Sequence, residues 1–148
     1  MLGKRRALGR TIDQLEVGET IHLTEKMSDK DLLLYLGLTN DNNPLYLQHD
    51  LAALTPFERP IIPSIMLIGV ITSAISKYVP GPGSHVVAQQ LQFPTPVYHY
   101  DTIEFNLQIE RVHVEQNTVT IAVEAMNREQ QIVVEGTVAV LAPPAITS

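Results

Sequence analysis

The sequence predicts an α+β fold in which an antiparallel sheet wraps around one long central helix. Two patterns support this prediction. Residues 61–78 are apolar on nearly every helical face, so a helix there needs cover on most sides. Residues 103–110 and 118–125 alternate apolar and polar side chains, which is typical of strands that bury one face. A strongly curved sheet gives the helix the cover that it needs.

Ahead of the central helix, the pattern predicts a short strand and two helices. The strand covers residues 20–25. Ser28 then has the side chain of a helix N-cap, and the aspartates that follow it place negative charge in the first turn, where the helix dipole favours it. The leucine-rich helix that begins there ends at residues 40–44, and a second, short helix covers 45–54.

The central helix starts near Pro63, and the Pro-Gly-Pro-Gly segment at residues 80–83 ends it. Further strands are predicted at residues 84–93 and 132–141. The turns between the last three strands are short, so consecutive strands pair as antiparallel hairpins. We expect a single six-stranded sheet around one helix, which is the hot-dog arrangement.

Composition indicates one domain over residues 1–148, of which 1–10 form a flexible basic tail. The net charge of −6 gives no field that draws the chain to nucleic acid or to a membrane surface. There is no cysteine, so disulfides and thiolate metal sites are excluded. No histidine pair has metal-ligand spacing with a carboxylate, so we expect no metal.

The apolar run at 61–78 is interrupted by proline, serine and threonine and is too short to span a bilayer. A cytoplasmic location is the default.

The segment at residues 39–46, Thr-Asn-Asp-Asn-Asn-Pro-Leu-Tyr, is the candidate site. It holds Asp41 in a turn-prone stretch shortly before the apolar helix. One acid or base beside a deep apolar wall suits a protein that binds or transforms a long, uncharged acyl chain.

Five segments carry a resemblance to a known family, at residues 15–19, 40–46, 57–62, 80–83 and 93–98 ahead of Asp101. Over nearly the whole chain they resemble the MaoC-like dehydratases, whose best-known members are the (R)-specific enoyl-CoA hydratases. The resemblance implies the hot-dog fold. It also implies an acyl-CoA or acyl-carrier-protein thioester as substrate, a homodimer, and no cofactor beyond the CoA thioester itself.

The family pattern in the candidate segment is Gly-Asp-x-Asn-Pro-x-His, in which the Asp and His activate the water that adds across the double bond. Asp41, Asn43 and Pro44 match this pattern, but Tyr46 stands in the position of the histidine. A tyrosine hydroxyl has a pKa of about 10 and is a poor proton acceptor near neutral pH. The resemblance therefore gives Asp41 the role of base and leaves that of Tyr46 open.

The family's His-Gly at the start of the central helix is Pro63-Ser64 here. The resemblance gives the Ser64 N–H the role of polarising the thioester carbonyl, because helix N-termini stabilise a developing oxyanion. Pro63, Asn43 and His49 are expected to line the substrate site. His49 follows Tyr46 by about one helical turn and is a candidate for a relocated base, although an ordinary surface histidine is the simpler interpretation.

The same residues have structural interpretations. Asp41 can cap a helix that begins at Pro44, Asn43 can be a turn residue, and Tyr46 can be a core aromatic that closes a vestigial site. Three classes of function follow from these alternatives. The first is an enoyl-thioester hydratase. The second is a catalytically impaired acyl-CoA-binding protein or the non-catalytic partner of a heteromeric dehydratase. The third is a structural domain. A thioesterase or a thioester-linked regulator has only fold analogy behind it.

Overall fold

A computed structural model describes residues 7–145 of the chain. The N-terminal part holds the short helix η1 (Ile12–Gln14), strand β1 (Thr20–Lys26), helix α1 (Asp29–Thr39), the short helix η2 (Pro44–Tyr46) and helix α2 (His49–Ala52). The central helix α3 (Ser64–Lys77) and the strands β2 (His85–Gln92), β3 (Thr102–His113), β4 (Thr118–Met126) and β5 (Ile132–Leu141) follow.

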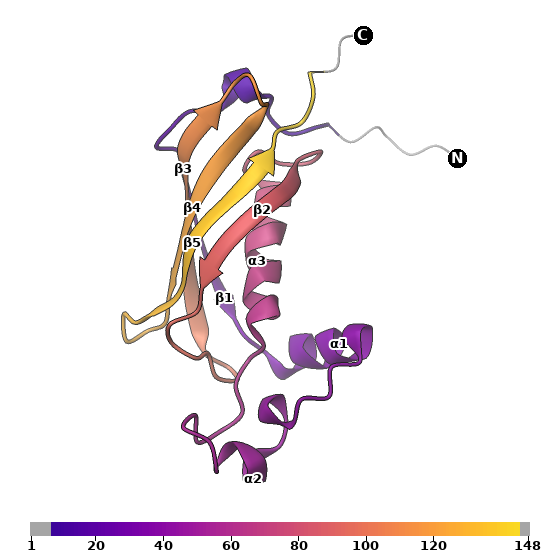
Figure 1. Cartoon of the computed structure of the whole chain (residues 1–148), viewed down its shortest axis with the longest axis vertical. Coiled ribbons are helices and arrows are strands. Elements are labelled where there is room, and N and C mark those ends of the chain that lie inside the picture. The colour runs from indigo at the N-terminus through magenta and orange to yellow at the C-terminus, as the bar shows by residue number, and fades with distance from the viewer. Residues whose placement is uncertain (1–6, 146–148) are drawn as a thin grey trace, which may run out of the picture.

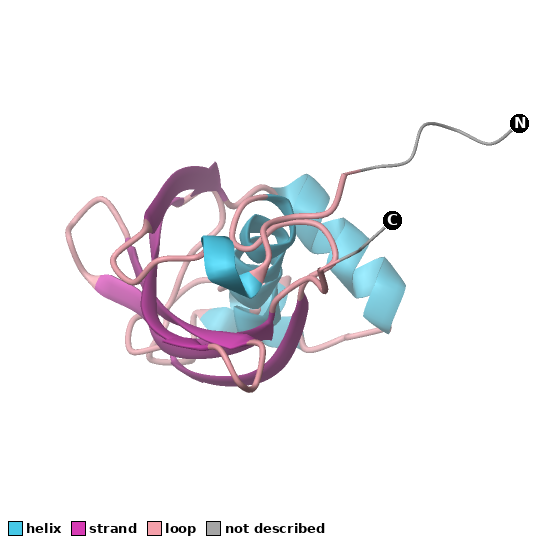
Figure 2. Ribbon diagram, turned by 90° about the horizontal axis from the view of Figure 1, so that it is seen from above, coloured by secondary structure: helices cyan, strands magenta, loops and turns pink. Residues whose placement is uncertain are grey.

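The sheet has five strands in the order β1-β3-β4-β5-β2, and every neighbouring pair is antiparallel. It curls around α3, as the view from above shows in Figure 2. The hot-dog arrangement is therefore confirmed, but the expectation of a sixth strand is wrong. Residues 44–63, between α1 and α3, form only η2, α2 and an isolated bridge between Ile61 and Tyr98, because turns and prolines interrupt any longer element.

The core lies between the concave face of the sheet and one side of α3. The alternation predicted for β3 is exact in burial: Ile103, Phe105, Leu107 and Ile109 are at most 1% exposed, while the residues between them face outward. These side chains share one apolar cluster with residues on α3: Leu67, Ile71, Ala74 and Ile75. This continuous cluster holds α3 against the curved sheet.

Two expectations about the central helix and the tail need correction. A stripe of α3 is not covered within one chain, and Ile65 on it is 45% exposed. Gly9 and Arg10 do not belong to a free tail, because their N–H groups donate to Pro82 O and Pro80 O at 2.6 and 2.9 Å. The Arg10 side chain also pairs with Glu19. The rest of the expected tail, residues 1–6, lies outside the described residues.

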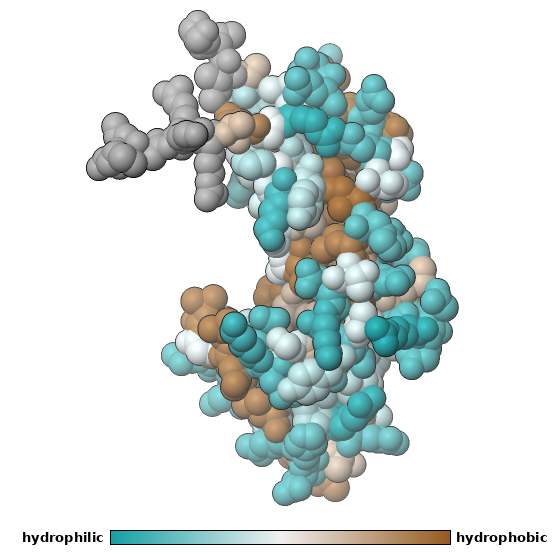
Figure 3. Space-filling view, turned by 180° about the vertical axis from the view of Figure 1, so that it is seen from behind, coloured by the Kyte–Doolittle hydropathy of each residue, from teal (hydrophilic) through white to brown (hydrophobic). Residues whose placement is uncertain are grey.

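Helices α1, η2 and α2 sit at one end of the molecule, beside the N-terminus of α3 and away from the curved sheet (Figure 1). Several leucines in this part stay exposed: Leu33, Leu34, Leu38 and Leu54 at 60%, 64%, 86% and 85%. Figure 3 shows apolar side chains gathered on the arm that α1 forms, next to a hollow in the outline of the molecule. The candidate segment thus belongs to a part of the chain that has few core contacts of its own.

Candidate active site

Asp41 lies in the turn that follows α1 and is half-buried. The helix ends at Asn40, whose left-handed backbone (φ 57°) turns the chain, a conformation that asparagine tolerates better than most residues. One carboxylate oxygen of Asp41 accepts a hydrogen bond from the Tyr35 hydroxyl at 2.8 Å, and the other accepts from the Asn43 N–H at 3.1 Å. The side chain is therefore held in one orientation by groups on both sides of the turn.

Tyr35 is a partner of Asp41 that the sequence did not single out. The hydrogen bond to Asp41 raises the pKa of Tyr35 above its ordinary value of about 10, with burial adding to the effect. The Tyr46 phenol also acts to raise this pKa. Tyr35 thus stays protonated near neutral pH and acts as a donor to the carboxylate, not as a base.

Asn43 and Tyr46 begin and end the local turn. The Asn43 side-chain oxygen accepts from the Leu45 N–H at 3.0 Å, so it caps η2 and fits the structural interpretation. The Tyr46 carbonyl lies 3.0 Å from His99 Nε2, and the Leu45 carbonyl accepts from the Ile61 N–H at 3.3 Å. These contacts tie η2 to the segment that leads into α3.

The N-terminus of α3 begins at Pro63 and Ser64. Pro63 is buried in the N-cap position, and Ser64 is exposed at the first helical position. The Ile62 N–H donates to the Val97 carbonyl at 2.7 Å, which anchors the entry to the helix on the segment between β2 and β3. The first turn of a helix has N–H groups without partners in the helix, and no acidic side chain occupies this one. An oxyanion at this point would meet the positive end of a helix of 14 residues.

His49 does not share a helical face with Tyr46, because the two residues belong to separate short helices. Leu47 has a non-helical backbone (φ −128°, ψ −31°), and α2 starts afresh at His49. Within residues 7–145, no hydrogen bond or ion pair joins His49 to Asp41. His49 instead lines a small cavity of about 210 Å³ with residues from three other segments, among them Arg59 and His99.

His99 and Asp29 form a second polar cluster that sequence reasoning missed. His99 Nδ1 lies 2.9 Å from an oxygen of Asp29, and the Tyr100 hydroxyl donates to the other oxygen at 2.9 Å. The backbone of Tyr100 is left-handed (φ 68°), which is uncommon for an aromatic residue. His99 therefore contacts both the start of α1 and the end of η2, the two ends of the segment that carries Asp41. No spacing rule could join Asp29 to residues 70 positions further along.

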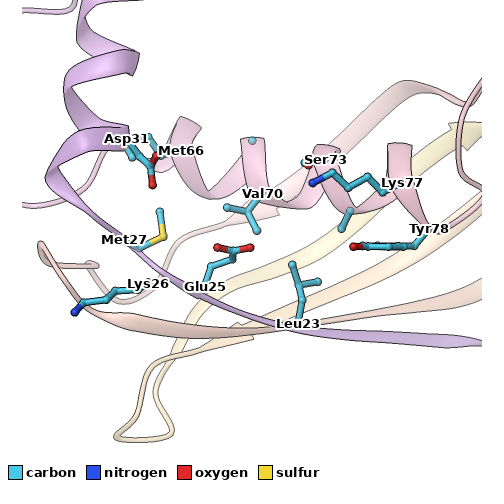
Figure 4. A pocket seen from close by; sticks show the side chains of 12 residues that line it. Leu23, Glu25, Lys26, Met27, Asp31, Met66, Val70, Ser73, Lys77 and Tyr78 are labelled. Carbon is cyan, nitrogen blue, oxygen red and sulfur yellow. The ribbon is translucent and has the colours of Figure 1, made fainter.

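A larger cavity, of about 380 Å³, lies between β1 and α3 (Figure 4). Its apolar walls come from both elements: Leu23, Met27, Met66, Val70 and Ala74. Glu25, Asp31 and Lys77 are exposed and add charge to its lining. Met66 lies in the first turn of α3 and Lys77 in the last, so at 1.5 Å per residue the cavity follows the helix for about 17 Å. It therefore runs along α3 from the first turn of the helix to the last.

Metal-binding and membrane-spanning features are not part of this arrangement. In the described part of the chain, no group of three or more histidine, aspartate or glutamate side chains is placed to hold a metal ion. None of the helices within residues 7–145 has the length and apolar character needed to cross a membrane.

Comparison with known proteins finds one matching family and relatives that are named as hydratases or dehydratases. The profile of the family described as MaoC like domain matches residues 11–133. An (R)-specific enoyl-CoA hydratase from Aeromonas caviae is 27% identical over 129 residues, which cover 87% of this chain and 96% of that protein. A 3-hydroxybutyryl-CoA dehydratase from Methylorubrum extorquens is 31% identical over 110 residues, covering 74% and 70% of the two chains.

Solved structures agree with the fold. The (R)-hydratase of A. caviae, described as involved in PHA biosynthesis, superposes with a TM-score of 0.82 at 27% identity and covers 88% of this chain and 98% of its own. An R-hydratase from Pseudomonas aeruginosa in its unliganded form gives the same TM-score at 28% identity, with coverage of 95% and 97%.

Proposed function

Because the chain belongs to the MaoC-like domain family, we propose that it adds water reversibly across the double bond of a trans-2-enoyl thioester. The relatives at 27% and 31% identity are named as an enoyl-CoA hydratase and a 3-hydroxybutyryl-CoA dehydratase, which are the two directions of such a reaction. The observation that carries the proposal is the fixed carboxylate of Asp41 on a turn tied to the entry of α3. The reaction needs no cofactor besides the thioester substrate.

In the proposed mechanism the thioester carbonyl accepts hydrogen bonds from the Ser64 N–H and the first turn of α3. Asp41 takes a proton from water while the water oxygen bonds to the β-carbon, and the electrons of the double bond move toward the carbonyl. The negative charge that develops on the carbonyl oxygen is stabilised by the helix N-terminus. Asp41 then returns this proton to the α-carbon, which gives the 3-hydroxyacyl thioester and restores the carboxylate.

Tyr35 and Tyr46 have supporting roles in this proposal. Tyr35 holds one oxygen of Asp41, which leaves the remaining lone pairs of the carboxylate for water. Tyr46 can orient that water through its hydroxyl but does not accept its proton near neutral pH. Asn43 shapes the turn, and Pro63 presents the first N–H of α3. We place the acyl chain in the cavity between β1 and α3, whose apolar lining includes Met66 in the first turn of α3.

A second chain of the same protein is the partner that we propose for the uncovered surface. Ile65 on α3 is 45% exposed, Val87 on β2 is 52% exposed, and β2 is a sheet edge. A free edge beside an apolar helix face favours pairing across a twofold axis. Light scattering should give the mass of a dimer at micromolar concentration, and a monomer would contradict this part of the proposal.

The experiment that tests the activity is a hydration assay with crotonyl-CoA and with a longer enoyl-CoA, followed by loss of the conjugated thioester absorbance. The position of Tyr46 supports one alternative, a protein that binds acyl thioesters without efficient turnover. Calorimetric binding of the same thioesters separates the two. Binding with no turnover would favour the binding protein or a non-catalytic partner of a dehydratase.

A further inference from the structure

The small cavity lined by His49 has no role in the hydration step described above. Its residues come from the start of α1, the start of α2, the segment before α3 and the segment between β2 and β3: Asp29, His49, Arg59, Pro60, Tyr98, His99 and Tyr100. Four segments distant in sequence thus converge on a space of about 210 Å³. Nearly all of these side chains carry hydrogen-bonding or charged groups, which a merely structural gap in the packing does not require.

Arg59 is the permanently charged cation that lines this cavity, and its guanidinium is held in place by an aromatic ring. Its guanidinium stacks over the Tyr98 ring, with 3.9 Å between the guanidinium carbon and the ring centroid. The Tyr98 hydroxyl donates to the Phe57 carbonyl at 2.9 Å, which fixes the ring. Stacking uses the face of the guanidinium and leaves its in-plane N–H donors available.

The carboxylates near Arg59 do not neutralise it. Within residues 7–145 no carboxylate oxygen lies within 4.0 Å of the guanidinium, although Glu58 and Asp50 are close in sequence. Asp29, the one carboxylate that lines the cavity, is occupied by Tyr100 and His99 at 2.9 Å each. In a chain with a net charge of −6, Arg59 thus lines the cavity as a cation with no carboxylate oxygen within 4.0 Å, and its N–H donors suit an anion.

The position of the cavity indicates which anion. Pro60 lines the small cavity and Met66 lines the large one, and Ser64 lies between these two residues in the sequence, at the start of α3. A thioester held at the Ser64 N–H would direct its acyl chain along the large cavity and its carrier arm toward Arg59. The carrier arms of CoA and of acyl carrier protein share a phosphate on pantetheine.

We propose that the cavity around Arg59 binds this phosphopantetheine phosphate, with the Arg59 fork as the main donor and His49 at the rim. The inference rests on the proposed function, because it takes the thioester to lie at Ser64. An arginine fork matches two phosphate oxygens at once, and such charge-assisted hydrogen bonds are the strong ones.

The test is calorimetric binding of crotonyl-CoA, crotonyl phosphopantetheine and crotonyl pantetheine to the full chain. Arg59→Gln should raise the Kd for the two phosphate-bearing ligands at least about tenfold and leave that for crotonyl pantetheine unchanged, because crotonyl pantetheine has no phosphate for Arg59 to bind. Arg59→Lys, which keeps the charge without the fork, should lose about threefold. Arg111→Gln, on the exposed face of β3, is the matched control and should change no Kd.

Three results would overturn the phosphate site: unchanged affinity for crotonyl-CoA in Arg59→Gln, an equal loss for crotonyl pantetheine, or a loss confined to CoA. The melting temperature of each variant shows whether the fold is intact, and Arg59→Lys supplies the comparison if Arg59→Gln is unstable. Because affinity is measured directly, the hydratase proposal is judged separately. Phosphate-dependent binding without turnover would contradict hydration and still support the site.

Discussion

The sheet with α3 and the segment that carries Asp41 are held in place by different forces. In the sheet and α3, side chains such as Phe105 and Ile71 are at most 1% exposed and belong to one apolar cluster. In residues 29–60, by contrast, Leu38 and Leu54 are more than 80% exposed, and polar contacts fix the turn around Asp41. Stability therefore belongs mainly to the first region, and the proposed chemistry depends on the precision of the second.

The largest effect should come from a charge placed in the first region. Ile71→Lys puts an ammonium at a position that is 1% exposed, which costs several kcal/mol against a total stability of about 5–15 kcal/mol. We expect loss of the folded state, seen as loss of the cooperative thermal transition by circular dichroism.

Leu38→Lys is the matched control in the second region, because Leu38 is 86% exposed. Its melting temperature should change by no more than a few degrees. Unfolding by both variants, or by neither, would contradict the division of roles between the two regions.

Asp41→Asn should leave the fold unchanged and remove most of the turnover. The amide keeps the shape of the side chain but cannot accept a proton, so kcat for crotonyl-CoA hydration should fall by about 10²–10⁴-fold. Asp50→Asn, an exposed aspartate in the same region, should retain the parent rate. If both variants keep full activity, Asp41 is a structural residue of the turn and the base lies elsewhere.

Sequence reasoning was most successful where local pattern and burial coincide. The alternation of apolar and polar residues predicted β3, and the prolines and glycines that flank α3 predicted its ends. Both signals are local, because they depend on residue spacing and turn chemistry. The prediction that α3 is enclosed was wrong at Ile65, which is exposed in the single chain. The apolar character of a residue does not reveal which neighbour covers it.

The candidate site was only partly predictable. Asp41 and Asn43 are close in sequence, and a hydrogen bond joins them in the structure. Tyr35 could have been found, because it lies six residues before Asp41 on the helix that leads to the turn. Asp29 and His99 are 70 positions apart in the sequence, so a single sequence gives no sign that they are in contact.

Tyr46→His tests whether the second region lacks only a proton acceptor. If Asp41, the Ser64 N–H and the acyl cavity are in working positions, an imidazole at position 46 should raise kcat by about a hundredfold. The rate of crotonyl-CoA hydration in steady state measures this. A variant that binds the thioester with parent affinity and stays inactive would instead favour the binding-protein alternative.

The smallest effect should come from Tyr35→Phe, which removes a single hydrogen bond to Asp41 and leaves the ring in place. A hydrogen bond to a carboxylate contributes about 1.5–3 kcal/mol at most, and water can replace part of it, so kcat should fall about three- to tenfold with little change in KM.

The pKa of Tyr35 is raised above its ordinary value of about 10, so the donor is protonated at every lower pH, and the contact is lost only as pH rises through that raised pKa. The ratio of parent to variant kcat should therefore be constant across the neutral range. Tyr98→Phe is the matched control for kcat, because it also removes one tyrosine hydroxyl bond, to Phe57 O, without touching Asp41; its effect belongs to thioester affinity, through the ring that supports Arg59. A ratio that changes near neutral pH would mean that Tyr35 exchanges protons in the reaction. Tyr35 would then be a catalytic partner of Asp41, and the proposal that it only holds the carboxylate in position would be wrong.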